Sequence, residues 1–269
     1  MRLSFSTLGC PDWTMAQVIA QGVQYGFDGV EIRGIGGEND LGKLREFAPE
    51  ERERTRRQFA DAGLEICSVD TSLTFASADP SDRMRSIEAT EWHAELAASL
   101  RSPYVRVFGG KAPEGVDRAE CTEYMAEALA EAGRRAAEHG VTVLLETHDW
   151  FTRGQDVAPV MERAACDHLG VIWDFRHSVH SGETLEETWD LIGRWVRHVH
   201  VKDETHEGKM CAVGDGDVPI AQCVDLLREK GFDGYLSLEW EKKWHPEIPE
   251  PEEIFPRYVD VMRRYLGEA

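Results

Sequence analysis

The sequence has 269 residues, of which 42% are hydrophobic and 30% are charged, and it contains 24 Gly and 11 Pro. This composition is that of a folded globular protein and excludes the collagen-like, disordered and mucin-like classes. Asp and Glu number 50 against 30 Lys and Arg, which gives a formal net charge of -20. A field of that sign repels nucleic acid and anionic membranes, so we expect neither as a partner.

No stretch reaches the roughly 20 apolar residues that a membrane-spanning helix requires. The N-terminus, Met-Arg-Leu-Ser-Phe-Ser-Thr, is typical of a strand rather than of a signal peptide. The cysteines occur singly, without a C-x-x-C pair, at Cys10, Cys67, Cys121, Cys166, Cys211 and Cys223. This spacing predicts reduced thiols in a cytoplasmic protein rather than a disulfide framework or a zinc ribbon.

Short β-rich runs alternate with longer segments of helical periodicity along the chain. In chain order, the first half contains predicted strands Leu3–Thr7, Gly29–Arg33, Glu65–Thr71 and Tyr104–Phe108. Its predicted helices are one that Asp12 caps and that stops at Gly26, one from Pro49 that stops at Gly63, one that Asp79 introduces and that runs through Leu100, and one from Asp117 that ends at Gly140. The second half contains strands Thr142–His148, Leu169–Asp174, Val196–Lys202 and Gly234–Trp240, and helices Gln155–Cys166, Glu183–Trp195, Pro219–Lys230 and Pro251–Leu266. Gly or Pro stands at most of the helix boundaries, as helix ends prefer.

Eight strand–helix units with a repeat of about 30 residues predict a single (β/α)8 TIM barrel, which has about 250 residues in its usual form. The alternative α/β architecture is a doubly wound open sheet. Two features favour the barrel: the count closes at eight, and no G-x-G-x-x-G follows the first strand. The loop Gly34-Ile35-Gly36-Gly37 follows the second strand and does not match that fingerprint. We therefore predict one TIM-barrel domain over residues 1–269.

Catalytic groups in such a barrel project from the carboxyl ends of the strands. The last four predicted strands carry polar groups there: Glu146 and His148, then Asp174 and His177, then His198, His200 and Lys202, then Glu239 and Glu241. Buried carboxylates cost several kcal/mol each unless they are paired or bind a metal. Two glutamates, one aspartate and one histidine would suit a divalent cation, with Mn2+, Mg2+ or Co2+ preferred and Zn2+ also fitting. Taken singly, each residue is also explained as an ion-pair partner, a cap or a core histidine.

Several short motifs in this order resemble the xylose isomerase-like TIM-barrel superfamily, the sugar phosphate isomerase/epimerase group. They are Gly29-Val30-Glu31-Ile32-Arg33, Leu145-Glu146-Thr147-His148, Asp174-x-x-His177, His198-Val199-His200-Val201-Lys202-Asp203, Gly214-x-Gly216-Asp217, and Gly231-Phe232-Asp233-Gly234 through Glu239. The resemblance implies that Glu146, Asp174, His200 and Glu239 bind one metal ion. It also implies that Glu146 and Glu239 transfer protons on opposite sides of the substrate, and that His177 contacts substrate oxygens.

The chemistry expected of such a site is proton transfer next to a carbonyl. A divalent cation that holds a carbonyl and an adjacent hydroxyl stabilises an enediolate, and two carboxylates can remove and return the proton. If the proton is removed from and returned to the same carbon, the result is epimerisation. If it moves to the neighbouring carbon, the result is aldose–ketose isomerisation, and if a β-hydroxyl leaves, the result is dehydration. We expect a metal-dependent isomerase or epimerase of a sugar, sugar phosphate or keto-cyclitol. The alternative is a dehydratase similar to inosose or 3-dehydroshikimate dehydratases.

The chain departs from the pattern of ketose 3-epimerases at two places. Those enzymes have a Glu several residues beyond the ligand of the fifth strand, where this chain has Thr152. They also have an Arg in the loop after the histidine of the seventh strand, where this chain reads Thr205-His206-Glu207. Both departures argue against a free ketohexose as the substrate.

Further polar residues at the predicted strand ends are candidates for substrate binding. Glu31 with Arg33, and Arg106 before Gly109-Gly110-Lys111, could bind substrate hydroxyls, a carboxylate or a phosphate. We include Lys202, which could stabilise an oxyanion, and His148, which shares a face with the Glu146 carboxylate. The structural alternative for these charged groups is an ion pair across the barrel rim.

Two other classes of protein share this fold. An endonuclease IV-like nuclease would need three zinc ions and extra histidines after the third and fourth strands, where this chain has Asp70-Thr71 and Phe108-Gly109. The net charge also opposes DNA binding. A metal-free binding protein is the other class, and the intact ligand set argues against it. The resemblance also leaves room for a homo-oligomer, although no sequence feature identifies an interface.

Overall fold

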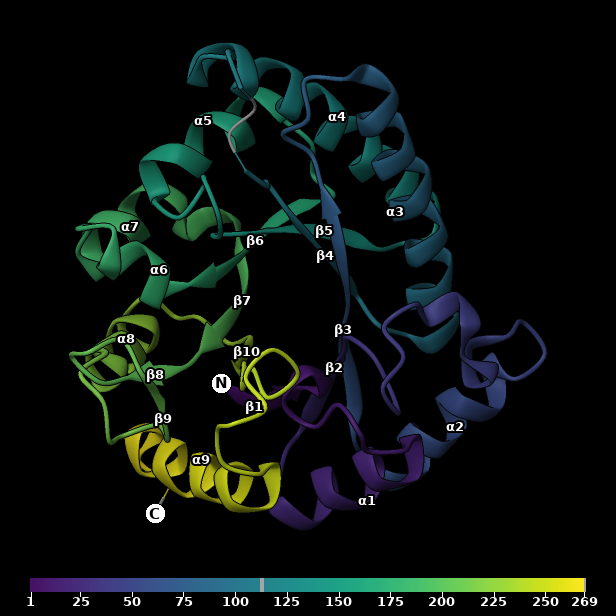
Figure 1. Cartoon of the computed structure of the whole chain (residues 1–269), viewed down its shortest axis with the longest axis vertical. Coiled ribbons are helices and arrows are strands. Elements are labelled where there is room, and N and C mark those ends of the chain that lie inside the picture. Colours follow the sequence, from purple (N-terminus) through teal and green to yellow (C-terminus); the bar gives the residue numbers. More distant parts are fainter. Residues whose placement is uncertain (112–113, 269) are drawn as a thin grey trace. The chain divides into compact units, whose positions relative to one another are not determined.

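The computed structural model describes residues 1–111 and 114–268. The chain is a (β/α)8 TIM barrel, in which eight strands close in the order β1-β10-β7-β6-β5-β4-β3-β2 (Figure 1). The predicted fold class is therefore confirmed. A small two-stranded sheet, β8 with β9, lies outside the barrel sheet.

The observed strands follow the predicted ones closely. They are β1 Arg2–Ser6, β2 Gly29–Ile32, β3 Glu65–Thr74, β4 Tyr104–Phe108, β5 Thr142–Glu146, β6 Leu169–Asp174, β7 Val196–Val201, β8 Asp203–Glu204, β9 Met210–Cys211 and β10 Tyr235–Leu238. The helices are α1 Met15–Tyr25, α2 Arg52–Ala62, α3 Pro80–Leu100, α4 Arg118–Glu138, α5 Gly154–Ala164, α6 Phe175–His180, α7 Leu185–Ile192, α8 Ile220–Glu229 and α9 Pro251–Leu266. Short 3-10 turns cover Thr7–Gly9, Leu41–Lys43, Arg45–Phe47 and Gly193–Trp195.

Two predicted helix starts are wrong by a few residues. The first helix is capped by Thr14 instead of Asp12, because Thr14 and Gln17 form a reciprocal capping box at its first turn. The second helix begins at Arg52 instead of Pro49. The short helix α6, directly after β6, was not predicted. In contrast, α3 and α4 have the predicted caps, Asp79 and Asp117.

Contacts group the described residues into two compact units. Unit 1 comprises residues 1–67 and 199–268, and unit 2 comprises residues 68–111 and 114–198. The single domain over the whole chain stays a prediction, and each unit is described by itself below.

In unit 1, β1 pairs in parallel with β10 and with β2, so that Phe5 lies opposite Leu238 and Ser6 opposite Glu31. The ring of Phe5 packs on Phe27 and on Phe255 of α9, at centroid distances of 4.7 and 4.9 Å. Since side chains alternate along a strand, Ser6 faces the opposite side from Phe5. The helix-facing side of β1 is therefore aromatic, and the other side is polar.

In unit 2, β4 pairs in parallel with β3 and β5, and β5 pairs with β6 (Figure 1). The register places Asp70 of β3 opposite Arg106 of β4, after which a bulge shifts the pairing before Thr74. It also places Phe108 opposite Glu146, the last residue of β5. The charged side chains of three neighbouring strands are thereby brought to one end of this part of the sheet.

No helix in the described ranges combines the length and the apolar character needed to cross a membrane. All six cysteines belong to the described residues, and none of them forms a disulfide.

Candidate active site at the strand ends

Glu146, at the end of β5, is completely buried and forms an ion pair with a buried arginine. Arg106 of β4 donates from Nη1 to Oε2 of Glu146 at 2.9 Å, and its Nη2 lies 3.8 Å from Oδ2 of Asp70. Asp70 in turn accepts a 2.7 Å hydrogen bond from the Ser68 hydroxyl. The Arg106 guanidinium also lies 4.1 Å from the centre of the Phe108 ring. The ion pair considered as a structural alternative for Arg106 is present.

Asp174 is the last residue of β6 and caps the N-terminus of α6. The capping role considered for it from the sequence is therefore present. Its backbone is held by Thr147, which accepts from the Asp174 N–H at 2.9 Å and donates to the Asp174 carbonyl at 3.1 Å. Its carboxylate oxygens face His177, with Oδ1 3.4 Å from the backbone N and Oδ2 3.4 Å from Nε2. The role of Thr147 was missed, because a threonine directly after a strand gives no sequence signal for such a bond.

The two candidate substrate-binding histidines of unit 2 are neighbours. The rings of His148 and His177 meet edge to face, with centroids 4.8 Å apart. Nδ1 of His148 lies 3.2 Å from Oδ2 of Asp149. This contact, together with the nearby Lys111 ammonium, holds the pKa of the Asp149 carboxyl below its usual value. Asp149 has a left-handed backbone with φ 53°.

A hollow of about 470 Å³ is lined by residues at or after the ends of β3, β4 and β5, and Asp149, the partner of His148, is one of them. Its lining includes Ser77, the backbone of Gly110, and the charged side chains of Lys111 and Asp149. The Gly109-Gly110-Lys111 segment is recognisable in the sequence, whereas no sequence signal marks Asp149 for a role here.

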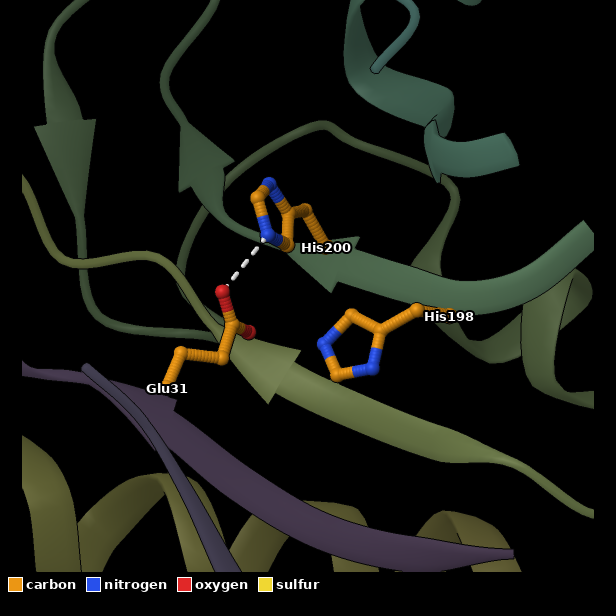
Figure 2. Close-up of side chains that lie close together, drawn as sticks. All are labelled: Glu31, His198 and His200. Atoms are coloured by element: carbon orange, nitrogen blue, oxygen red, sulfur yellow. Dashed lines mark hydrogen bonds and ion pairs between the residues drawn. The ribbon is translucent and has the colours of Figure 1, made fainter. Parts of the chain in front are cut away.

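In unit 1, His200 of β7 lies between two carboxylates. Its Nε2 is 3.0 Å from Oε2 of Glu31 on β2, and its Nδ1 is 3.5 Å from Oε1 of Glu239 (Figure 2). All three side chains are buried. The ring therefore presents one nitrogen to each carboxylate, and Figure 2 shows the second nitrogen on the side away from Glu31.

Glu239 is also held by a buried lysine. Lys202 donates from Nζ to Oε2 of Glu239 at 2.7 Å and to Oε1 of Glu241 at 2.9 Å. Only 1% of Lys202 is exposed, and an ammonium this deep requires close carboxylates to offset its lost hydration. Pairing of Lys202 with neighbouring carboxylates, one of the two roles considered from the sequence, is therefore present.

Arg33 of unit 1 and His198, the last residue of unit 2, are buried too. Arg33 is 7% exposed, and its backbone N–H donates to the Thr7 hydroxyl at 2.9 Å. His198 lies two residues before His200 on β7 and projects to the same side of the strand (Figure 2). No role in the site was predicted for His198.

Asp203, which directly follows Lys202, organises the loop beyond β7. Its two carboxylate oxygens accept backbone N–H bonds from Glu204, Gly214, Gly216 and Val218 at 2.9–3.2 Å. The motif Gly214-x-Gly216-Asp217 is thereby explained, because a side chain on Gly216 would collide with Asp203. The sequence contained this motif, but its partner became visible only in the structure.

The structure brings the candidate residues together in three groups. In unit 2, Arg106 contacts Glu146, and His177 contacts both Asp174 and His148; in unit 1, Glu31, His200, Glu239 and Lys202 form a continuous chain of contacts. Metal binding and substrate binding by these residues stay predictions. Asp70-Thr71 within β3 and Phe108-Gly109 at the end of β4 occupy the positions where an endonuclease IV-like site would need histidines.

The comparisons with curated proteins identify relatives with several activities. The 3-dehydroshikimate dehydratase of Bacillus anthracis is 25% identical over 246 residues, which cover 84% of this chain and 85% of that protein. A putative hydroxypyruvate isomerase of Streptomyces coelicolor is 28% identical over 158 residues, which cover 55% of this chain and 56% of that protein. The names of these relatives thus include both a dehydratase and an isomerase.

The fold comparison agrees with the barrel described above. The crystal structure of the IOLI protein with a bound zinc atom superposes with a TM-score of 0.84 at 16% identity, covering 100% of this chain and 99% of that one. At this identity the similarity shows the fold alone. The family model described as xylose isomerase-like TIM barrel matches residues 19–265. The chain therefore belongs to the xylose isomerase-like TIM barrel family.

Proposed function

We propose that the protein is a divalent-metal-dependent isomerase or epimerase of a small carbohydrate or cyclitol. The observation that carries this proposal is the presence of buried metal-ligand side chains in each unit: Glu146 and Asp174 in unit 2, and His200 and Glu239 in unit 1. The family membership supports an enzyme of this class, because relatives are named as a putative hydroxypyruvate isomerase and a 2-oxo-tetronate isomerase. Zinc in one structural neighbour supports a divalent metal as the cofactor.

The chemistry of the donor set fits a divalent cation. Three carboxylates and one imidazole are hard or borderline ligands, which suit Mn2+, Mg2+ or Co2+, and Zn2+ as well. Two ligand atoms about 2.1 Å from a metal and about 90–110° apart are about 3.0–3.4 Å from each other. The separation of 3.5 Å between Nδ1 of His200 and Oε1 of Glu239 is close to this spacing. These two atoms would therefore face the cation together.

When bound, the cation would acidify a carbon-bound proton of the substrate by stabilising negative charge on adjacent oxygens. Glu146 and Glu239 would move that proton, and each carboxylate is oriented by a positively charged side chain. Arg106 holds Oε2 of Glu146, and Lys202 holds Oε2 of Glu239. Fixing one oxygen of each carboxylate leaves little rotational freedom, so the other oxygen is aimed before substrate arrives. His177 and His148 would contact substrate oxygens.

A dehydratase is the second candidate. The match to the dehydratase of Bacillus anthracis extends over 84% of this chain, against 55% for the hydroxypyruvate isomerase. The same first proton abstraction would then be followed by loss of a β-hydroxyl. Product spectra separate the two functions, because dehydration adds a conjugated chromophore and epimerisation leaves the ultraviolet spectrum unchanged.

The first experiment is elemental analysis of the purified protein after exposure to Mn2+, Co2+, Mg2+ or Zn2+. We expect about one ion per chain in the wild type and none in Asp174→Asn. A solvent-deuterium exchange screen over ketoses and keto-cyclitols would then identify the substrate. Absence of bound metal under every condition would overturn the proposal that these four residues bind a metal ion. Two or three zinc ions per chain would favour a nuclease instead.

We further propose that the protein works in the cytoplasm. Six cysteines without a disulfide support a reducing compartment. Cell fractionation, with the chain detected by an antibody, tests this location.

A further inference from the structure

The buried pair Glu31–His200 carries an inference that rests on the proposed function and deepens it. Glu31 belongs to strand β2 and is completely buried. Its Oε2 lies 3.0 Å from Nε2 of His200 (Figure 2). The sequence left two roles open for Glu31, substrate binding and an ion pair. In the structure its carboxylate contacts the histidine proposed as a metal ligand.

Carboxylate oxygens accept hydrogen bonds, whereas in a neutral imidazole one nitrogen donates and the other accepts. The contact of Nε2 with Glu31, at 3.0 Å, is within hydrogen-bond distance and shorter than the 3.5 Å between Nδ1 and Glu239, so we assign the proton of the neutral ring to Nε2. The lone pair is then on Nδ1, which faces Oε1 of Glu239 at 3.5 Å. Two electron-rich atoms at that distance repel each other unless a cation lies beside them both. The arrangement is thus suited to a metal on the Nδ1 side of the ring.

We propose that Glu31 is a positioning residue that selects Nδ1 of His200 as the metal-binding nitrogen. A carboxylate on the opposite ring nitrogen fixes the orientation of the ring and makes the ligating nitrogen more basic, and loss of such a partner lowers metal affinity by about 10- to 100-fold. Glu31 itself contacts neither metal nor substrate in this assignment.

One competing arrangement uses the same residues. Glu31, His198 and His200 also form a buried group that could hold a metal ion by themselves (Figure 2). In that arrangement Nε2 of His200 and the Glu31 carboxylate would both be ligands. The two assignments make opposite predictions about which nitrogen binds the metal and about how far the loss of Glu31 weakens binding.

The test is long-range 1H–15N spectroscopy of the full chain labelled with 15N-histidine, in which His200→Gln assigns the His200 resonances. We expect the Nε2–H tautomer in the metal-free protein, and Zn2+ should shift Nδ1 while Nε2 keeps its proton. An Nδ1–H tautomer, or a shift at Nε2 on adding Zn2+, would overturn the assignment. This measurement needs no change at Glu31, so it decides the point even where a substitution there prevents folding.

Zinc affinity, measured by competition with a chromogenic chelator, provides the second readout. Glu31→Gln should bind Zn2+ about 10- to 100-fold more weakly, because an amide can donate as well as accept and no longer specifies the tautomer. Glu65→Gln is the matched control: Glu65 is also a strand glutamate of unit 1, but it pairs with Arg2 and Tyr235, and its affinity should equal that of the wild type. Unchanged affinity in Glu31→Gln, or complete loss that points to Glu31 as a ligand, would refute the inference. A wild type that binds no Zn2+ would refute the proposed function first.

Discussion

Replacing Asp203 tests how the loop after β7 is held at the end of the barrel. The Asp203 carboxylate is 2% exposed and accepts four backbone N–H bonds, two at each oxygen. A hydrogen bond to a charged group contributes about 1.5–3 kcal/mol, so four bonds give about 6–12 kcal/mol before relaxation. Gly214 is exposed, and Gly216 and Val218 are partly exposed, so water can reach their N–H groups once the carboxylate is gone.

We therefore expect Asp203→Ala to lower the free energy of unfolding by about 3–5 kcal/mol, less than the gross sum. Asp203→Asn keeps the acceptor that serves Glu204 and Val218, and turns an amide donor toward Gly214 and Gly216. Its expected loss is about 2 kcal/mol.

Urea unfolding at pH 7, followed by far-ultraviolet circular dichroism, measures these differences. Asp215→Ala is the control, because Asp215 forms an exposed pair with Arg257 and should cost less than about 1 kcal/mol. An Asp203→Ala protein within about 1 kcal/mol of the wild type would refute the reasoning, because it would mean that the four bonds contribute no net stability.

Three further predictions follow from the contacts described above. Glu239→Gln should reduce turnover of the true substrate by at least about 100-fold while the circular dichroism spectrum is unchanged; substantial remaining activity would exclude Glu239 as a proton carrier. Gly216→Ala should destabilise the protein by about 2 kcal/mol or more, because its new methyl group would collide with Asp203, and equal urea midpoints would contradict that collision. Side-chain hydrogen bonds from Arg56 and Arg57 lower the pKa of Glu53 from 4.5 to about 2. NMR titration should therefore find the Glu53 midpoint near 2, and Arg56→Gln should raise that midpoint. Because the pKa is lower in the folded state, the stability from these bonds is present above the unfolded pKa and is lost as the pH falls toward the folded pKa. A wild-type midpoint near 4.5 would show that these bonds do not persist in solution.

The two proposed proton-transfer carboxylates differ in the cation that holds them. Arg106 presents a planar guanidinium to Glu146, and Lys202 presents a single ammonium that bridges Glu239 and Glu241. An ammonium can rotate its three N–H bonds among acceptors, whereas a guanidinium has a fixed fork. The Glu146 side is therefore the more rigid of the two.

Local sequence signals determined most of the fold. Caps such as Asp79 and Asp117, and the left-handed glycines Gly26 and Gly63, mark helix ends because each acts within one turn of its own chain. Strand positions followed from short apolar runs, and the alternation of side chains sorted the polar residues at the strand ends. Even local signals can compete: Asp12 is a good capping residue, but Thr14 lies two residues later and has Gln17 to complete its capping box.

Only the tertiary structure decided which charged groups are partners. Arg106 and Glu146 are 40 residues apart in the chain, and Glu31 and His200 are 169 apart. The sequence placed each of them at or near a strand end, but it left open whether Arg106 binds a substrate or a carboxylate. Pairing depends on the register of neighbouring strands and on the depth of each side chain, and neither quantity is encoded within a single strand. The identity of the ion-pair partners is for that reason a property of the folded barrel.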